Sequence, residues 1–130
     1  MEIRISMPTH MKATPKSPSS ALSMNGYRNA HYRVLSNLKK TYFEEVKKQI
    51  GSASSLHDGP VVVQCKYFAP RGGTDLDNFT VVHEKFFMDS IVKLGYIRDD
   101  NCDVVVKITK EFVRVDRGNP RVEITVKSID

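Results

Sequence analysis

Four stretches of the chain alternate between hydrophobic and polar residues, which is the pattern of a β-strand with one buried face. The first places Ile3, Ile5 and Met7 on one side and stops at Pro8. The second covers residues 61–68. The last two, residues 104–115 and 121–127, are rich in valine. The residues that separate these last two strands, 116–120, are typical of a turn, so we predict that the strands form a hairpin.

Two other stretches have hydrophobic residues at helical spacing. The first begins at Ser36 or Asn37, either of which is a suitable N-cap, and ends at Gly51. Its hydrophobic face consists of Leu38, Tyr42, Val46 and Ile50. The second covers residues 79–94 and ends at Gly95. Since Tyr42 belongs to a hydrophobic face, we expect it in the core.

The segment from Thr9 to Ser23 contains two prolines and four serines and predicts a flexible loop. The predicted order is therefore strand, loop, helix, strand, helix, strand, strand. This order indicates an α/β (α+β) fold, a small domain with a mixed β-sheet and helices packed on it. A chain of 130 residues has room for one such domain, which we expect to span residues 1–130.

Composition limits the classes of protein. No hydrophobic run approaches the roughly 18 residues that cross a bilayer, and no signal peptide is evident at the N-terminus, so we expect a cytoplasmic protein without a membrane partner. We expect the two cysteines, Cys65 and Cys102, to be reduced thiols. The net charge of +5 favours a polyanionic partner such as DNA. Many of the acids, in contrast, gather between Asp75 and Asp103.

The acids of Thr74-Asp75-Leu76-Asp77-Asn78 have two interpretations. In an extended segment Asp75 and Asp77 point to the same side, so their carboxylates can bind one cation. Alternatively, the acids solvate a turn, and Asp77 or Asn78 caps the following helix. The sequence of this segment alone favours the second interpretation.

A second acidic pair, Asp99-Asp100, follows the helix at 79–94 and changes this balance. If both pairs lie at one end of the sheet, their charges repel unless a cation lies between them. Carboxylates without supporting His or Cys ligands favour Mg²⁺, with Mn²⁺ as a substitute. Two such ions catalyse phosphodiester cleavage in many nucleases. Lys85 has two interpretations of equal weight, a contact with the scissile phosphate or an ion pair with Asp89.

These motifs together resemble the RusA family of Holliday junction resolvases. The resemblance rests on Asp75-Leu76-Asp77-Asn78, on a helix with Lys85 and Asp89 four residues apart, and on the segment from Gly95 to Asp100. The segment Asn25-Gly26-Tyr27-Arg28 is similar to one that precedes the first helix in the family. The interval from Asp77 to Lys85 is longer than in the family by about one helical turn.

The resemblance implies a homodimeric, Mg²⁺-dependent endonuclease, often of phage or prophage origin, that resolves four-way DNA junctions by paired nicks. Its implied metal ligands are Asp75, Asp77 and Asp100, with Asp99 as the alternative to Asp100. Lys85 is the implied catalytic lysine, oriented by Asp89, and no organic cofactor is implied. We assign DNA contacts to residues of the similar N-terminal segment and to nearby basic residues: Asn25, Tyr27, Arg28, Arg33, Lys39, Lys40 and Arg71.

Two further hypotheses remain open. The same fold would also suit a broader endonuclease for branched DNA or flaps. In the other hypothesis the chain is a non-catalytic, basic DNA-binding module whose acids only cap and solvate. Other catalytic classes lack support because the histidines are scattered, no serine or cysteine lies in a nucleophile motif, and neither a P-loop nor a dinucleotide fingerprint occurs.

Overall fold

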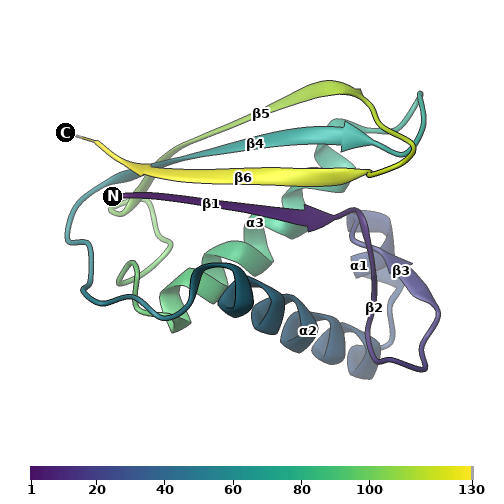
Figure 1. Ribbon diagram of the computed structural model, residues 1–130, viewed down its shortest axis with the longest axis horizontal. Coiled ribbons are helices and arrows are strands. Elements are labelled where there is room, and N and C mark those ends of the chain that lie inside the picture. Colours follow the sequence, from purple (N-terminus) through teal and green to yellow (C-terminus); the bar gives the residue numbers. More distant parts are fainter. Residues whose placement is uncertain (130) are drawn as a thin grey trace.

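The computed structural model describes residues 1–129; Asp130, the last residue of the predicted domain, lies outside them. Within this range a four-stranded mixed sheet has the order β1-β6-β4-β5 (Figure 1). Its strands are β1 (Glu2–Pro8), β4 (Val61–Ala69), β5 (Val105–Val115) and β6 (Arg121–Ser128). The helices are α1 (Met24–Asn29), α2 (Tyr32–Ile50) and α3 (Leu76–Lys93). The predicted α+β fold class is confirmed.

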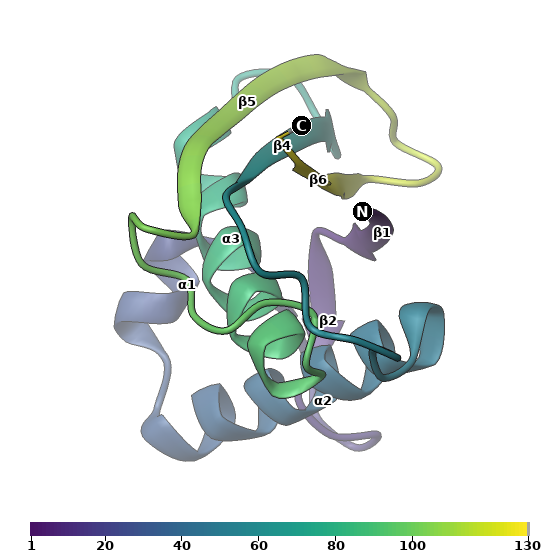
Figure 2. The same cartoon turned by 90° about the vertical axis from the view of Figure 1, so that its left-hand side faces the viewer.

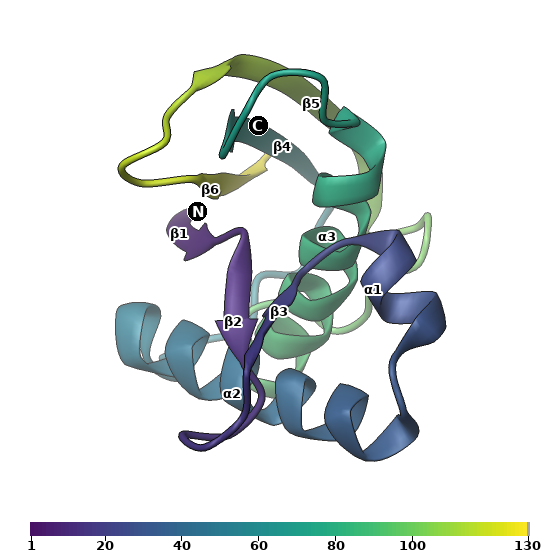
Figure 3. The same ribbon diagram turned by 90° about the vertical axis from the view of Figure 1, so that its right-hand side faces the viewer.

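The helices cover one face of the sheet and leave the other face open (Figures 2 and 3). On β1 the predicted hydrophobic side, Ile3, Ile5 and Met7, is buried, whereas the residues between them are exposed. The buried side chains of α2 are three of the four predicted ones, Leu38, Tyr42 and Val46. The core therefore lies between the sheet and α2 and α3, because each element is hydrophobic on one side only.

The predicted hairpin of the last two strands is wrong. β4 lies between β5 and β6, and it pairs parallel with β5 and antiparallel with β6. β6 also pairs antiparallel with β1, so it is a central strand. The physical reason is burial: Val122, Ile124 and Val126 of β6 are fully buried in the middle of the sheet, where two neighbouring strands cover the backbone of β6.

The segment at residues 9–23 is more ordered than a loop. It contains the antiparallel strands β2 (His10–Lys12) and β3 (Ser19–Ala21). Ala13 and Leu22 are buried, and the backbone N–H of Leu22 donates to the carbonyl of Thr9 at 2.8 Å. The prediction of a loop is therefore wrong for β2 and β3, because two hydrophobic residues anchor a segment that prolines and serines otherwise dominate. Its flexibility stays a prediction.

The helix ends agree with the sequence better than the helix starts. α2 ends before Gly51, and α3 ends just before Gly95. α2 starts at Tyr32 with His31 as its N-cap, and α1 was not predicted. Both cysteines are free thiols, Cys65 buried and Cys102 exposed. Among the described helices, none is both long enough and apolar enough to cross a membrane.

Candidate functional site

Asp75 is the N-cap of α3. Its Oδ1 accepts hydrogen bonds from the backbone N–H groups of Asp77 at 3.0 Å and Asn78 at 3.4 Å. The sequence suggested Asp77 or Asn78 as the cap, which is wrong; the alternative, an extended backbone for the acids, holds for Asp75 and is wrong for Asp77. Because α3 begins three residues earlier than predicted, at Leu76, Asp77 lies in the first helical turn.

Asn78 connects this helix start to α1. Its Oδ1 accepts a hydrogen bond from the backbone N–H of Asn25 at 3.1 Å. Gly26 also lets α1 pack closely against β3: a Cβ there would lie 2.7 Å from the carbonyl oxygen of Ala21. Two motif segments far apart in the sequence, 25–28 and 75–78, therefore meet in space.

The two segments enclose a hollow of about 440 Å³. α3 and its N-cap contribute Asp75, Asp77 and Asn78, and α1 contributes Asn25 and Arg28. The remaining lining residues are Met24 and Val81. Carboxylate and amide oxygens thus face a guanidinium across open space. Such a site can hold a hard cation on one wall and a phosphate on the other.

Lys110 of β5 lies beside Asp77, and the sequence did not indicate it. Its Nζ is 3.2 Å from Oδ1 of Asp77 and 2.7 Å from Oε1 of Glu84. Asp77 and Glu84 are seven positions apart on α3, which is about two turns, so both face β5. The Asp77 side chain is 76% exposed, whereas that of Glu84 is 13% exposed. The lysine therefore joins a buried acid to an exposed one.

The two acids stabilise the charged form of Lys110. Burial lowers the pKa of Lys110, but hydrogen bonds and charge from Glu84 and Asp77 outweigh burial and raise the pKa above its ordinary value. The sequence analysis missed Lys110, although one signal could have found it. In the alternation of β5, Lys110 takes a position on the helix-covered side between Ile108 and Phe112, opposite buried Cys65 of β4. A lysine at such a position needs an acidic partner.

Asp100 lies in a second, smaller hollow of about 150 Å³. Lys85 and Asp89 of α3 line the same hollow, together with Lys39 of α2, Tyr27 and Phe86. Burial raises the pKa of Asp100, and the neighbouring Asp99 and Asp89 raise it further. The structure therefore brings Lys85, Asp89 and Asp100 together, whereas the sequence predicted that Asp100 lies with Asp75 and Asp77.

The two hollows lie at different heights along α3. Asp77 and Lys85 are eight residues apart, which is about 12 Å along a helix that rises about 1.5 Å per residue. Within residues 1–129 no three His, Cys, Asp or Glu side chains form a group that could hold a metal ion. The structure thus pairs Asp75 with Asp77 and places Asp100 with Lys85.

The donor set around Asp75 and Asp77 nevertheless fits Mg²⁺. Protein sites for Mg²⁺ commonly supply one or two carboxylates, and water and substrate phosphates complete the shell. Asp75 uses its Oδ1 in the helix cap, while Asp77 is largely exposed. Two carboxylates beside the Asn78 amide are sufficient for such a site without Asp100.

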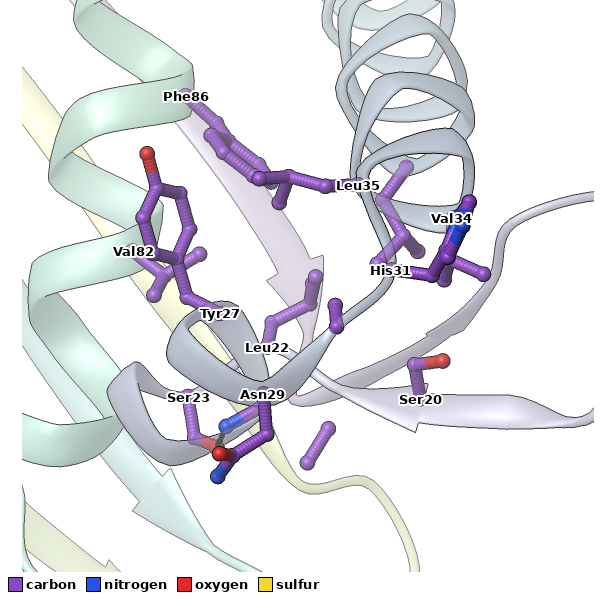
Figure 4. Close-up of a pocket in the computed structure, with 14 residues that line it drawn as sticks. Ser20, Leu22, Ser23, Tyr27, Asn29, His31, Val34, Leu35, Val82 and Phe86 are labelled. Carbon is purple, nitrogen blue, oxygen red and sulfur yellow. Dashed lines mark hydrogen bonds between the residues drawn. The ribbon is translucent and has the colours of Figure 1, made fainter.

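Tyr27 lies between the second hollow and a hydrophobic pocket of about 300 Å³ (Figure 4). Leu22, Leu35, Val82 and Phe86 form its apolar wall. Ser20, Ser23, Asn29 and His31 supply polar groups to the pocket lining. Packing of β3, α1, α2 and α3 thus leaves a space beside the basic residues of α1 and α2.

The other predicted DNA contacts are spread around these hollows. Lys39 Nζ lies 6.0 Å from the centre of the Tyr27 ring, and the Arg33 guanidinium lies 5.8 Å from that of exposed Tyr32. Arg71 is exposed in the turn between β4 and α3, and its carbonyl accepts a hydrogen bond from Thr74 at 3.4 Å. Lys40 is exposed on α2 and lines neither hollow.

Fold and site together define a small α+β domain with an acidic helix start facing a basic short helix. Comparison of the sequence with protein-family models gives no match. Comparison with curated proteins likewise gives no similar sequence.

Proposed function

We propose that this protein is a Mg²⁺-dependent endonuclease that resolves four-way DNA junctions by paired nicks. One observation carries the proposal: the two segments that resemble the RusA family, 25–28 and 75–78, are joined by the hydrogen bond from Asn25 to Asn78 and share one hollow. If these two segments lay far apart on the surface, they would not form a common site.

The residues of the first hollow have complementary roles in this proposal. Asp75 and Asp77 hold Mg²⁺, which when bound activates water and stabilises the leaving oxygen of a phosphodiester. Arg28, on the opposite wall, binds a DNA phosphate through its planar guanidinium. Lys110 stands closest to Asp77, so we assign it the role of a positive charge beside the scissile phosphate.

The second hollow has a supporting role. Lys85 and Lys39 line it with Asp100, so these lysines contact the DNA backbone at a distance from the cut, Lys85 about two helical turns along α3. Asp100 then acts outside the first metal shell unless the DNA brings the hollows together. The chain acts as a homodimer because paired nicks on a two-fold symmetric junction need two related sites. We place the activity in the cytoplasm of a bacterial or phage-infected cell.

A cleavage assay with synthetic DNA tests the proposal. We expect the protein and Mg²⁺ to nick a four-way junction symmetrically on opposing strands. Asp77→Asn should abolish nicking and leave junction binding within about twofold, because it removes a charge that binds metal and keeps the side-chain shape. Asp58→Asn, in the exposed segment before β4, is the matched control and should nick normally.

Forks, flaps and duplexes assayed beside the junction separate a resolvase from a broader branched-DNA endonuclease. Equal rates on flaps and junctions would favour the broader enzyme. Loss of both binding and nicking in Asp77→Asn would contradict the metal role.

One observation favours a second candidate, a non-catalytic DNA-binding module. Asp75 caps α3 and Asp77 pairs with Lys110, so each acid also has a structural use. Titration calorimetry distinguishes the candidates. An endonuclease binds Mg²⁺ or Mn²⁺ in the low-millimolar range and loses this binding in Asp77→Asn, whereas a module binds junctions without any divalent ion.

A further inference from the structure

β5 is an open edge of the sheet. It is eleven residues long, and among residues 1–129 its one neighbouring strand is β4, so its outer edge has no strand beside it in that range (Figure 2). Four of its hydrophobic side chains are exposed: Val106 at 48%, Ile108 at 44%, Phe112 at 52% and Val113 at 40%. Long, apolar edge strands are rare in monomers because they pair with other strands.

The opposite edge, β1, is protected in the usual manner. It is seven residues long, ends at Pro8, and exposes Glu2, Arg4 and Ser6. Of the nine exposed large hydrophobic residues among positions 1–129, four lie on β5, and the others are scattered. The exposed apolar side chains are thus concentrated on the β5 edge of the sheet, whereas the β1 edge is polar.

The charged side chains of β5 complement those of a second β5 strand that pairs with it antiparallel. Lys107, Thr109 and Glu111 align with Val62, Gln64 and Lys66 of β4 and therefore lie on the open face of the sheet. If a second β5 pairs antiparallel about Thr109, Lys107 of each copy lies opposite Glu111 of the other. Val106 and Phe112 are then also opposite each other. Pairing about Lys110 would instead place this lysine opposite itself.

We propose that β5 pairs with β5 of a second copy of this chain, antiparallel and about a two-fold axis at Thr109. The two four-stranded sheets become one continuous sheet, and the interface is isologous. The pairing follows from the edge itself, but its use in paired nicking rests on the proposed function. Lys110 lies one residue from the axis, so dimerisation couples the interface to the acids Asp77 and Glu84 of both copies.

Molar mass measured by light scattering after gel filtration tests the pairing. We expect the wild-type chain to have twice the monomer mass of 14.7 kDa at micromolar concentration. Lys107→Glu and Glu111→Lys, each alone, create two like-charge pairs and should raise the dimer Kd about tenfold or more. The double variant restores opposite charges and should regain the wild-type Kd within about twofold.

Two controls keep the result interpretable. Lys48→Glu makes the same charge change at an exposed position of α2, outside the sheet, and should leave the Kd unchanged. Ile108→Lys should leave a monomer, and circular dichroism melting verifies that each variant is folded. A monomeric wild-type chain, or single charge variants with the wild-type Kd, would overturn the pairing, as would a double variant no tighter than the singles.

The nicking assay separates this inference from the proposed function. If the chain dimerises and its Kd responds to the charge variants as expected, but it cuts no DNA, the endonuclease proposal is wrong and the β5 pairing stands. Conversely, a wild-type chain that nicks junctions as a monomer would overturn the β5 pairing and the homodimer, and would leave the metal-dependent nuclease activity intact.

Discussion

Lys110 shows how one residue decides the chemistry of a site. Its ammonium group lies within 3.2 Å of Asp77, while Lys85, which the motif spacing favours, lines another hollow with Asp89 and Asp100. The additional helical turn between Asp77 and Lys85 moves Lys85 away along α3. A lysine from β5 occupies the position beside the acid instead.

Lys110→Met should lower the rate of junction nicking by about 10²-fold, and Lys85→Met by less than tenfold. The reason is that Lys110 stands beside Asp77, whereas Lys85 lines the other hollow. Nicking rates at saturating Mg²⁺ measure the effect. Lys110→Arg, which keeps the charge that Glu84 needs, should recover part of the rate and retain stability. A larger loss for Lys85→Met would return the catalytic role to Lys85.

His83 predicts the pH dependence of stability. Burial lowers its pKa from 6.5 to about 3. Its Nδ1 lies 3.0 Å from the hydroxyl of buried Tyr42, and its Nε2 has no partner among the described residues. Between pH 6.5 and 3 the unfolded chain therefore binds a proton that the folded chain excludes, so stability falls as the pH falls through this window.

From pH 7 to pH 5 this histidine should cost about 2 kcal/mol of unfolding free energy. His83→Gln keeps a polar partner for Tyr42 and has no such titration. Urea unfolding at both pH values measures the difference. The same decrease in His83→Gln would show that other groups cause it.

At the scale of an element, the start of α3 combines folding with chemistry. Asp75 satisfies two backbone N–H groups of the first turn, and its negative charge lies at the positive end of the helix dipole. The same carboxylate lines the first hollow. Substitutions of Asp75 must therefore distinguish its role as a helix cap from its role in the first hollow.

Asp75→Ala should lower the unfolding free energy by about 1 kcal/mol, because the cap is lost. Asp75→Asn should stay within a few tenths of a kcal/mol of the wild type, because asparagine also caps helices. Under the proposed function both variants should lose nicking, since both lack the charge. Thermal unfolding and the junction assay measure the two effects. Equal destabilisation by Asn and Ala would contradict the cap as the source of stability.

At the scale of the molecule, the fold gives the two sides of the sheet different shapes. The helix side carries both hollows, in which the basic residues Arg28, Lys39 and Lys85 stand beside four aspartates. The open face carries Arg4, Lys66 and Lys127 beside Glu123. Because the proposed metal ligands lie on the helix side, we expect DNA to bind there.

Arg28→Ala should weaken junction binding and reduce the slope of log K against log salt by about one. The slope counts the phosphate contacts, and Arg28 is expected to make one. Fluorescence anisotropy at several salt concentrations measures it. Lys66→Ala removes a charge from the open face and should leave the slope unchanged. An equal effect of Lys66→Ala would place the DNA on that face.

The sequence predicted the positions of strands and helices better than it predicted which strands are neighbours in the sheet. Alternation located β1, β4, β5 and β6, and helical spacing located α2 and α3, because both patterns are local consequences of one buried face. Residues 25–28 and 75–78 were candidates because their motifs are also local in the sequence. Strand order failed: the short turn at 116–120 suggested a hairpin, whereas burial of Val122, Ile124 and Val126 needed β4 beside β6.

The sequence by itself determined the fold class, the main strands and helices, and the acids and basic residues that are candidates for a site. These properties depend on residues close in the chain. Only the tertiary structure decided that Asn25 meets Asn78, that Lys110 pairs with Asp77, and that Asp100 lies with Lys85. The physical reason is that ion pairs and hollows depend on how strands and helices pack, and packing is set by the burial of the whole core.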